Sequence, residues 1–257
     1  MRQQPDISDP YRAIAAYYDA EHDRFTDDLV MYRHLAEMAD GPILELACGS
    51  GRILEAVIEQ EHPVTGIDTS AIMTERCRAR FAERDRKPHL QVGSMVDRVA
   101  DPGSQSLVII GLSSLHHVVT QSEQRSALQA ASDALRTGGM LVLDLLNPFV
   151  ALTGPDERVS LETTLEIPDG TLQKFSVQTI DPAEQHIRHT VWYDLTSSGG
   201  AVQRVQTTMD LRLVFPSELE LLLELAGLTS WQIYGSYDLD SFDASSPRLI
   251  VMAEKHA

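Results

Sequence analysis

The sequence is poor in cysteine and in long apolar runs. Its two cysteines, Cys48 and Cys77, form no Cys-x-x-Cys pair and no cysteine–histidine spacing typical of a metal site. This pattern predicts reduced thiols in a reducing compartment rather than a disulfide framework. No apolar run reaches the roughly 20 residues that span a membrane, and the first residues carry no apolar signal core. We therefore expect a cytoplasmic protein with no membrane association.

Basic residues are also scarce. Lysine and arginine number 21 against 38 aspartates and glutamates, which gives a formal net charge of −17. Such a field repels phosphate backbones, so a nucleic-acid partner is not expected. No cluster of histidine, cysteine or carboxylate residues has metal-ligand spacing, so we predict no metal. The hydrophobic content of 43% is ordinary for a globular chain, and 257 residues suffice for one large domain with an insertion or for two small domains.

Apolar runs and helical patterns alternate between residues 41 and 150. The runs at 107–110 and 140–146 show no polar alternation, as in strands buried on both faces. Thr120 with Glu123, and Ser217 with Glu220, have the spacing of capping boxes that open helices. Residues 214–257 add a helix and two further strands. The pattern predicts an α/β fold with a doubly wound, seven-stranded, mostly parallel sheet, formed by residues 41–150 and 214–257.

Two segments do not follow this pattern. Residues 151–213 contain four runs with period-two alternation joined by short turns, which predicts an inserted antiparallel sheet with one apolar face. We expect that face to serve as an acceptor lid or as a dimer contact. Residues 1–40 predict two helices, one from Tyr11 to Tyr18 and one with an apolar stripe from Phe25 to Ala39, that cover the cleft.

A glycine turn follows the first predicted strand, at residues 43–46. Gly49 and Gly51 form the turn, and Asp68 ends the second strand about 20 residues later, where a carboxylate can take the hydroxyls of a ribose. Leu54 stands where a nicotinamide-binding turn has its third glycine, and no Gly-Lys-Ser/Thr follows as in a phosphate-binding loop. The turn therefore predicts a pocket for an adenosine-bearing cofactor other than a dinucleotide.

The motifs from this turn onward resemble those of one enzyme family. Leu44-Glu-Leu-Ala-Cys-Gly-Ser-Gly-Arg52 is similar to the first motif of class I S-adenosylmethionine-dependent methyltransferases, in particular of their bacterial small-molecule subgroup. Matches to the later motifs follow in order: Gly66-Ile-Asp-Thr-Ser70, Gln91-Val-Gly-Ser-Met95, Gly111-Leu-Ser-Ser-Leu-His-His117 and Leu135-Arg-Thr-Gly-Gly139. The resemblance implies the Rossmann-like methyltransferase fold, with S-adenosyl-L-methionine as cofactor and S-adenosyl-L-homocysteine as product.

The resemblance also implies a set of cofactor-binding residues. Asp68 would accept the ribose hydroxyls, Gly49 and Gly51 would let the backbone approach the cofactor, and Glu45 would orient the turn or receive the methionyl ammonium. The full set is Tyr18, Tyr32, Glu45, Ala47, Gly49, Gly51, Asp68, Thr69, Ser94, Met95 and Leu112. Ala47 stands where many members have glycine, and Ser94 where an aspartate often meets the adenine.

His117 is the candidate general base, ahead of its neighbour His116. Many methyltransferases need no base, because alignment of nucleophile, methyl group and sulfur supplies most of the effect. The expected reaction is in-line methyl transfer to an oxygen or nitrogen of a small molecule. A non-catalytic cofactor-binding module and an NAD-dependent oxidoreductase are the alternatives. The acceptor, and the choice between monomer and homodimer, stay open at this point.

Overall fold

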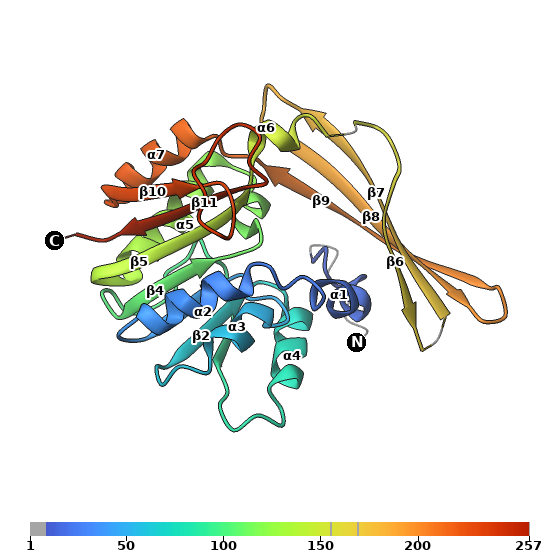
Figure 1. Cartoon of the computed structure of the whole chain (residues 1–257), viewed down its shortest axis with the longest axis horizontal. Coiled ribbons are helices and arrows are strands. Elements are labelled where there is room, and N and C mark those ends of the chain that lie inside the picture. The colour runs from blue at the N-terminus through green and yellow to red at the C-terminus, as the bar shows by residue number, and fades with distance from the viewer. Residues whose placement is uncertain (1–8, 155, 169, 257) are drawn as a thin grey trace, which may run out of the picture.

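The protein folds into two sheets with helices around the larger one (Figure 1). The computed structural model describes residues 9–154, 156–168 and 170–256. Within them, no helix is both long enough and apolar enough to cross a membrane.

The main sheet has seven strands in the order β10-β11-β5-β4-β1-β2-β3. Their bounds are Ile43–Leu46 (β1), Val64–Asp68 (β2), His89–Val92 (β3), Gln105–Ile110 (β4), Leu135–Leu146 (β5), Ser230–Tyr234 (β10) and Arg248–Glu254 (β11). All neighbours pair in parallel except β11, which is antiparallel to both β5 and β10. This confirms the predicted seven-stranded, mostly parallel sheet, whose sites lie at the carboxyl ends of the strands.

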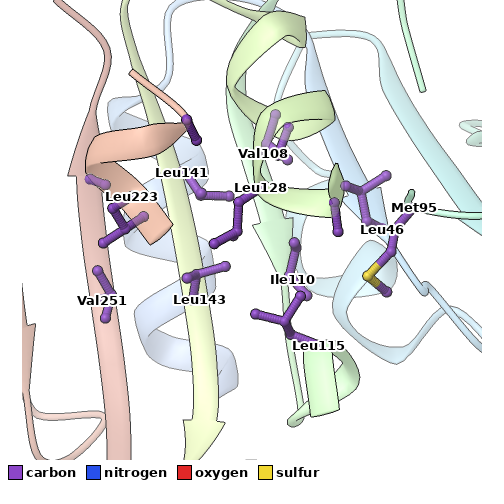
Figure 2. Close-up of a cluster of buried hydrophobic side chains, with 14 of the residues drawn as sticks. Leu46, Met95, Val108, Ile110, Leu115, Leu128, Leu141, Leu143, Leu223 and Val251 are labelled. Carbon is purple, nitrogen blue, oxygen red and sulfur yellow. The ribbon is translucent and has the colours of Figure 1, made fainter. Parts of the chain in front are cut away.

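Helices cover both faces of this sheet. The helices of the described residues are α1 (Ala15–His22), which packs on the second sheet, and α2 (Leu29–Met38), α3 (Arg52–Val57), α4 (Ala71–Arg80), the 3₁₀ helix η1 (Ser114–His117), α5 (Gln121–Ala134), α6 (Pro148–Ala151) and α7 (Pro216–Leu225). On one face, Leu128 of α5 and Leu223 of α7 pack over the central strands (Figure 2). On the other, Leu35 of α2, Leu54 of α3 and Cys77 of α4 form a second cluster. Both faces of the sheet are therefore buried from solvent, which explains the unbroken apolar runs of β4 and β5.

The second sheet is antiparallel, in the order β6-β7-β8-β9, as the insertion predicts. Its strands are Ser160–Ile167 (β6), Gly170–Asp181 (β7), His186–Ser197 (β8) and Val202–Arg212 (β9). Its apolar face contacts residues 9–28, called the N-terminal segment below. Ile14 of this segment packs in one cluster with Leu172 and Tyr193. Strand β9 is an edge strand and lies beside η1.

Three local predictions met different outcomes. The first helix spans Ala15–His22 rather than starting at Tyr11, because the Tyr11 N–H donates to the side chain of Asp9 (3.0 Å) and residues 10–14 form turns. The capping box at Thr120 is confirmed, with the Glu123 N–H donating to its hydroxyl (3.2 Å). The second capping box is wrong. Helix α7 begins at Pro216 with Phe215 as its N-cap, since proline is well suited to the first helical position.

Candidate active site

Gly49 and Gly51 of the turn between β1 and α3 have different roles. Ala47, Gly49 and Gly51 all have left-handed backbone, with φ of 59°, 53° and 87°. A Cβ on Gly51 would lie 2.5 Å from the Cys77 sulfur, so this glycine lets the turn pack on α4. A Cβ on Gly49 would meet only a side-chain carbon 3.8 Å away, and Gly49 faces the cavity described below.

Asp68 braces this turn from the end of β2. One carboxylate oxygen accepts the Gly49 N–H and the other accepts the Ser70 N–H, both at 2.8 Å. Burial raises the pKa of Asp68, while these two backbone hydrogen bonds oppose the rise. Each oxygen keeps a further lone pair, because a carboxylate accepts about four hydrogen bonds. Asp68 can therefore brace the turn and still take hydroxyl groups of a ligand.

Glu45 of β1 is a buried acid at the cavity wall. Only 3% of its surface is exposed, and its Oε2 atom has no hydrogen-bond partner among the described residues. Burial raises the pKa of Glu45 well above its usual range, against the opposing charge of Arg52. A buried carboxyl oxygen without a partner is rare and suits a cationic ligand group. The ammonium and sulfonium of S-adenosylmethionine are such groups, so Glu45, Asp68 and the open face of Gly49 fit the implied cofactor.

One cavity of about 1140 Å³ collects most of the predicted site. Ten of the predicted residues line it: Tyr18, Glu45, Ala47, Gly49, Asp68, Thr69, Ser94, Met95, Leu112 and His117. They come from the carboxyl ends of the first, second and fourth parallel strands, from the loop after β3, from η1 and from α1.

Tyr32 and Gly51 lie outside this lining. Tyr32 is completely buried on α2, and its hydroxyl donates to Asp144 (3.4 Å) instead of facing the cavity. Burial raises the pKa of Tyr32 well above its usual range. Tyr32 lies on the apolar stripe of α2, and a tyrosine at such a position usually buries its ring in the core and places its hydroxyl against a nearby hydrogen-bond partner.

A tyrosine–histidine pair also lines the cavity. The hydroxyl oxygen of Tyr11 lies 3.1 Å from the Nε2 atom of His117. Burial lowers the pKa of His117 to about 4, with a smaller contribution from His189, and the imidazole is neutral near pH 7. Tyr11 also packs edge-on against Tyr18, with ring centroids 5.8 Å apart. Sequence reasoning missed Tyr11, although its seven-residue spacing from Tyr18 was a signal for a shared face.

His116, by contrast, belongs to the core. It is completely buried, and its Nδ1 atom lies 2.8 Å from the backbone oxygen of Arg212 at the end of β9. Burial lowers its pKa to about 4. His116 therefore helps to join η1 to the second sheet.

The N-terminal segment closes the cavity between the two sheets. On the main-sheet side, the Ser70 hydroxyl donates to Asp9 (2.6 Å) and the Arg76 guanidinium to Asp19 (3.0 Å). On the second-sheet side, Glu21 accepts both the Lys174 ammonium and the Tyr193 hydroxyl at 2.5 Å. Thr207 to Asp210 of β9 complete the wall there; the sequence predicts the inserted sheet as an acceptor lid or dimer contact but singles out none of these residues. No cluster of three potential metal ligands occurs among the described residues.

The chain is similar to known methyltransferases in sequence and in fold. Residues 43–139 match a family model described as a methyltransferase domain. YqeM of Bacillus subtilis (strain 168), which carries a provisional methyltransferase name, is 24% identical over 251 residues, covering 95% of this chain and 97% of YqeM.

Two solved structures share the fold. An S-adenosylmethionine-dependent methyltransferase from Clostridium acetobutylicum ATCC 824 superposes with a TM-score of 0.78 at 14% identity, covering 97% of this chain and 100% of the other. The sugar N-methyltransferase KedS8 from Streptoalloteichus sp ATCC 53650 gives 0.75 at 19% identity, covering 95% and 93%.

Proposed function

Since residues 43–139 match a methyltransferase domain, we propose that the chain is an S-adenosylmethionine-dependent methyltransferase and that it methylates an amino nitrogen of a small, polar, sugar-like molecule. The cofactor lies at the glycine turn, and the acceptor lies at the Tyr11–His117 end of the same cavity. The observation that carries the proposal is the half-buried, neutral imidazole of His117 beside the Tyr11 hydroxyl. The structural likeness to the sugar N-methyltransferase KedS8 supports this acceptor class.

The cofactor half of the cavity binds and orients. When bound, S-adenosylmethionine supplies an electrophilic methyl group on a positively charged sulfur. We assign Asp68 to the ribose hydroxyls, Glu45 to the positive methionyl end, and Ser94 with Met95 to the adenine. Gly49 and Ala47 supply the main-chain surface of the turn, with Thr69 beside Asp68, Tyr18 on the cover and Leu112 at the methyl-group end.

The low pKa of His117 favours nitrogen over oxygen as the acceptor atom. A hydroxyl must lose its proton while it attacks, and an imidazole whose pKa is about 4 is a weak base for that task. A neutral amine already carries the attacking lone pair and needs no proton removal before the bond forms. Burial also disfavours the ammonium form of an amine in this pocket.

His117 and Tyr11 then act mainly as orienting groups. Their nitrogen and oxygen lone pairs can accept the N–H bonds of the amine and turn its own lone pair toward the methyl group. After transfer, the methylated nitrogen carries a positive charge and releases one proton to water. The N-terminal segment and β9 form the acceptor wall in this proposal and exclude bulk water from the reacting atoms.

The test is methyl transfer from labelled S-adenosylmethionine to amino sugars and to their hydroxyl analogues. We expect label in the amino sugars, on nitrogen, and a loss on the order of 100-fold in kcat for His117→Gln, because misorientation of the nucleophile costs about that much. His34→Gln, at an exposed position, is the control. Transfer to the hydroxyl analogues alone, or full activity of His117→Gln, would refute the proposal.

A further inference from the structure

We propose that Asp144 and Arg248 form a positioning pair that holds the turn at Leu112 and Ser113, and thereby the cavity wall between cofactor and acceptor. Neither residue lines the cavity, so neither touches the reacting groups. Asp144 lies near the end of β5 and Arg248 begins the antiparallel neighbour β11, where the two strands pair.

The turn itself has a conformation that needs support. Leu112 and Ser113 follow β4 directly and have φ of 46° and 64°. Two consecutive non-glycine residues with left-handed backbone are unusual, because the Cβ atom crowds the backbone there. Such a conformation persists only where surrounding contacts hold it, and it occurs most often at functional sites.

Asp144 and Arg248 supply those contacts. The Leu112 N–H donates to the carboxylate of Asp144 (3.1 Å), and the Ser113 N–H donates to the backbone oxygen of Asp144 (2.7 Å). Arg248 donates from Nη2 to the Ser113 hydroxyl (2.9 Å) and from Nε to the Asp144 carboxylate (2.7 Å). The pair therefore grips both residues of the turn, by backbone and by side chain.

The carboxylate is also fixed by its own surroundings. Asp144 is completely buried, and it accepts the hydroxyls of Tyr32 (3.4 Å) and Tyr237 (3.1 Å) on the oxygen that receives the Leu112 N–H. Tyr237 packs edge-on against Phe25 of the N-terminal segment, with ring centroids 5.8 Å apart. This gives Tyr32 a role in supporting the turn from α2.

The chain after the turn explains why the pair matters for catalysis. Leu112, Ser114 and His117 all line the cavity within six residues. Their positions depend on the direction in which the chain leaves Ser113. A carboxylate can accept every one of the donors around it, whereas an asparagine would turn an N–H₂ group toward an arginine or a backbone N–H. The charge, and not only the shape, of Asp144 is required.

The experiment compares Asp144→Asn with Asp194→Asn. Asp194 is a matched control, since it is also buried and bonded twice to an arginine, Arg204, but lies in the second sheet. Calorimetry measures S-adenosylhomocysteine affinity, and NMR of labelled histidines follows the titration of His117. We expect Asp144→Asn to weaken binding about tenfold and to move the pKa of His117 upward by at least one unit, as its wall loosens toward water.

The milder variants Tyr237→Phe and Arg248→Lys keep the test decisive if Asp144→Asn fails to fold. Both should shift affinity and titration in the same direction by a smaller amount. Unchanged affinity and an unchanged His117 titration in the folded variants would overturn the proposal, as would equal changes in Asp194→Asn. Neither measurement needs a methyl acceptor. A negative result would therefore refute the role of Asp144 and Arg248 without bearing on the proposed acceptor class.

Discussion

The two parts of the cavity that we propose for the cofactor and for the acceptor, called the cofactor end and the acceptor end, are built in different ways. The cofactor end is made largely of main chain at the ends of parallel strands, where Asp68 receives the backbone N–H groups of Gly49 and Ser70. The acceptor end is made of side chains from three separate segments, which are the N-terminal residues, η1 and β9. Main-chain groups are the same whatever the side chains are, so a site built from them keeps binding the same ligand. Side chains can be replaced by mutation, so an enzyme can change its acceptor without changing its methyl donor.

The titratable groups differ between the ends in the same way. The histidines whose pKa values are clearly lowered lie in α1, η1 and β8, on the acceptor side: His22, His116, His117 and His189. At the cofactor end burial raises the pKa values of two carboxyl groups, Glu45 and Asp68. As the pH falls, protonation of these histidines should therefore destabilise the acceptor end before the cofactor end.

The largest expected effect tests that difference. His116 and His117 have a pKa of about 4 in the folded protein, against about 6.5 for an exposed histidine. The unfolded chain binds more protons between these values, so stability is full above pH 6.5 and is lost as the pH falls toward 4. Between pH 6.5 and pH 4, each of these two histidines should lower the free energy of unfolding by about 3 kcal/mol. Urea unfolding from pH 7 to pH 4 measures the loss.

In that experiment, His117→Gln should remove about one histidine's share of the pH dependence. His34→Gln, on the exposed surface, is the control for this comparison. Equal slopes for wild type and His117→Gln would show that the histidine is not buried and neutral.

The second effect concerns the cofactor end alone. Asp68→Ala removes a charged acceptor and leaves the N–H groups of Gly49 and Ser70 without their partner. S-adenosylhomocysteine binding should weaken by about 1.5–3 kcal/mol. Calorimetry measures the loss, with the exposed Asp101→Ala as control. An unchanged affinity would remove Asp68 from the ribose site.

The smallest effect concerns the link between the N-terminal segment and the second sheet. Burial acts to raise the pKa of Glu21, but Lys174, His22 and the Tyr193 hydroxyl outweigh it and hold the pKa below its usual value. Glu21→Gln should cost about 1 kcal/mol of stability, since the pair with Lys174 is partly exposed. That contribution is present above about pH 4.5 and is lost as the pH falls through the lower folded pKa.

The two ends should respond to Glu21→Gln unequally. Acceptor KM should rise more than S-adenosylhomocysteine affinity falls, because Glu21 fixes α1, which contributes Tyr18 to the cofactor end, and not the glycine turn. Asp194→Asn, which breaks an ion pair within the second sheet only, is the control. A large loss of cofactor affinity in Glu21→Gln would show that the two ends are not independent.

Sequence reasoning succeeded where the geometry is local. The glycine turn, the spacing to Asp68 and the capping box at Thr120 depend on short-range sterics and hydrogen bonds, which neighbouring residues carry with them. It misjudged the start of the first helix and the N-cap of α7, because a side-chain turn at Asp9 and a proline at the first helical position competed with the helical pattern.

By itself the sequence determined the parallel sheet, the inserted antiparallel sheet and the methyl donor, since apolar periodicity and a contiguous motif encode them. Tertiary structure decided the acceptor end. Tyr11 and His117 are 106 positions apart and meet only because the N-terminal segment docks between the two sheets. It also turned Tyr32 inward to Asp144, 112 positions away. Periodicity shows which face of a helix is buried, but the partner of a buried hydroxyl is set by packing of distant segments.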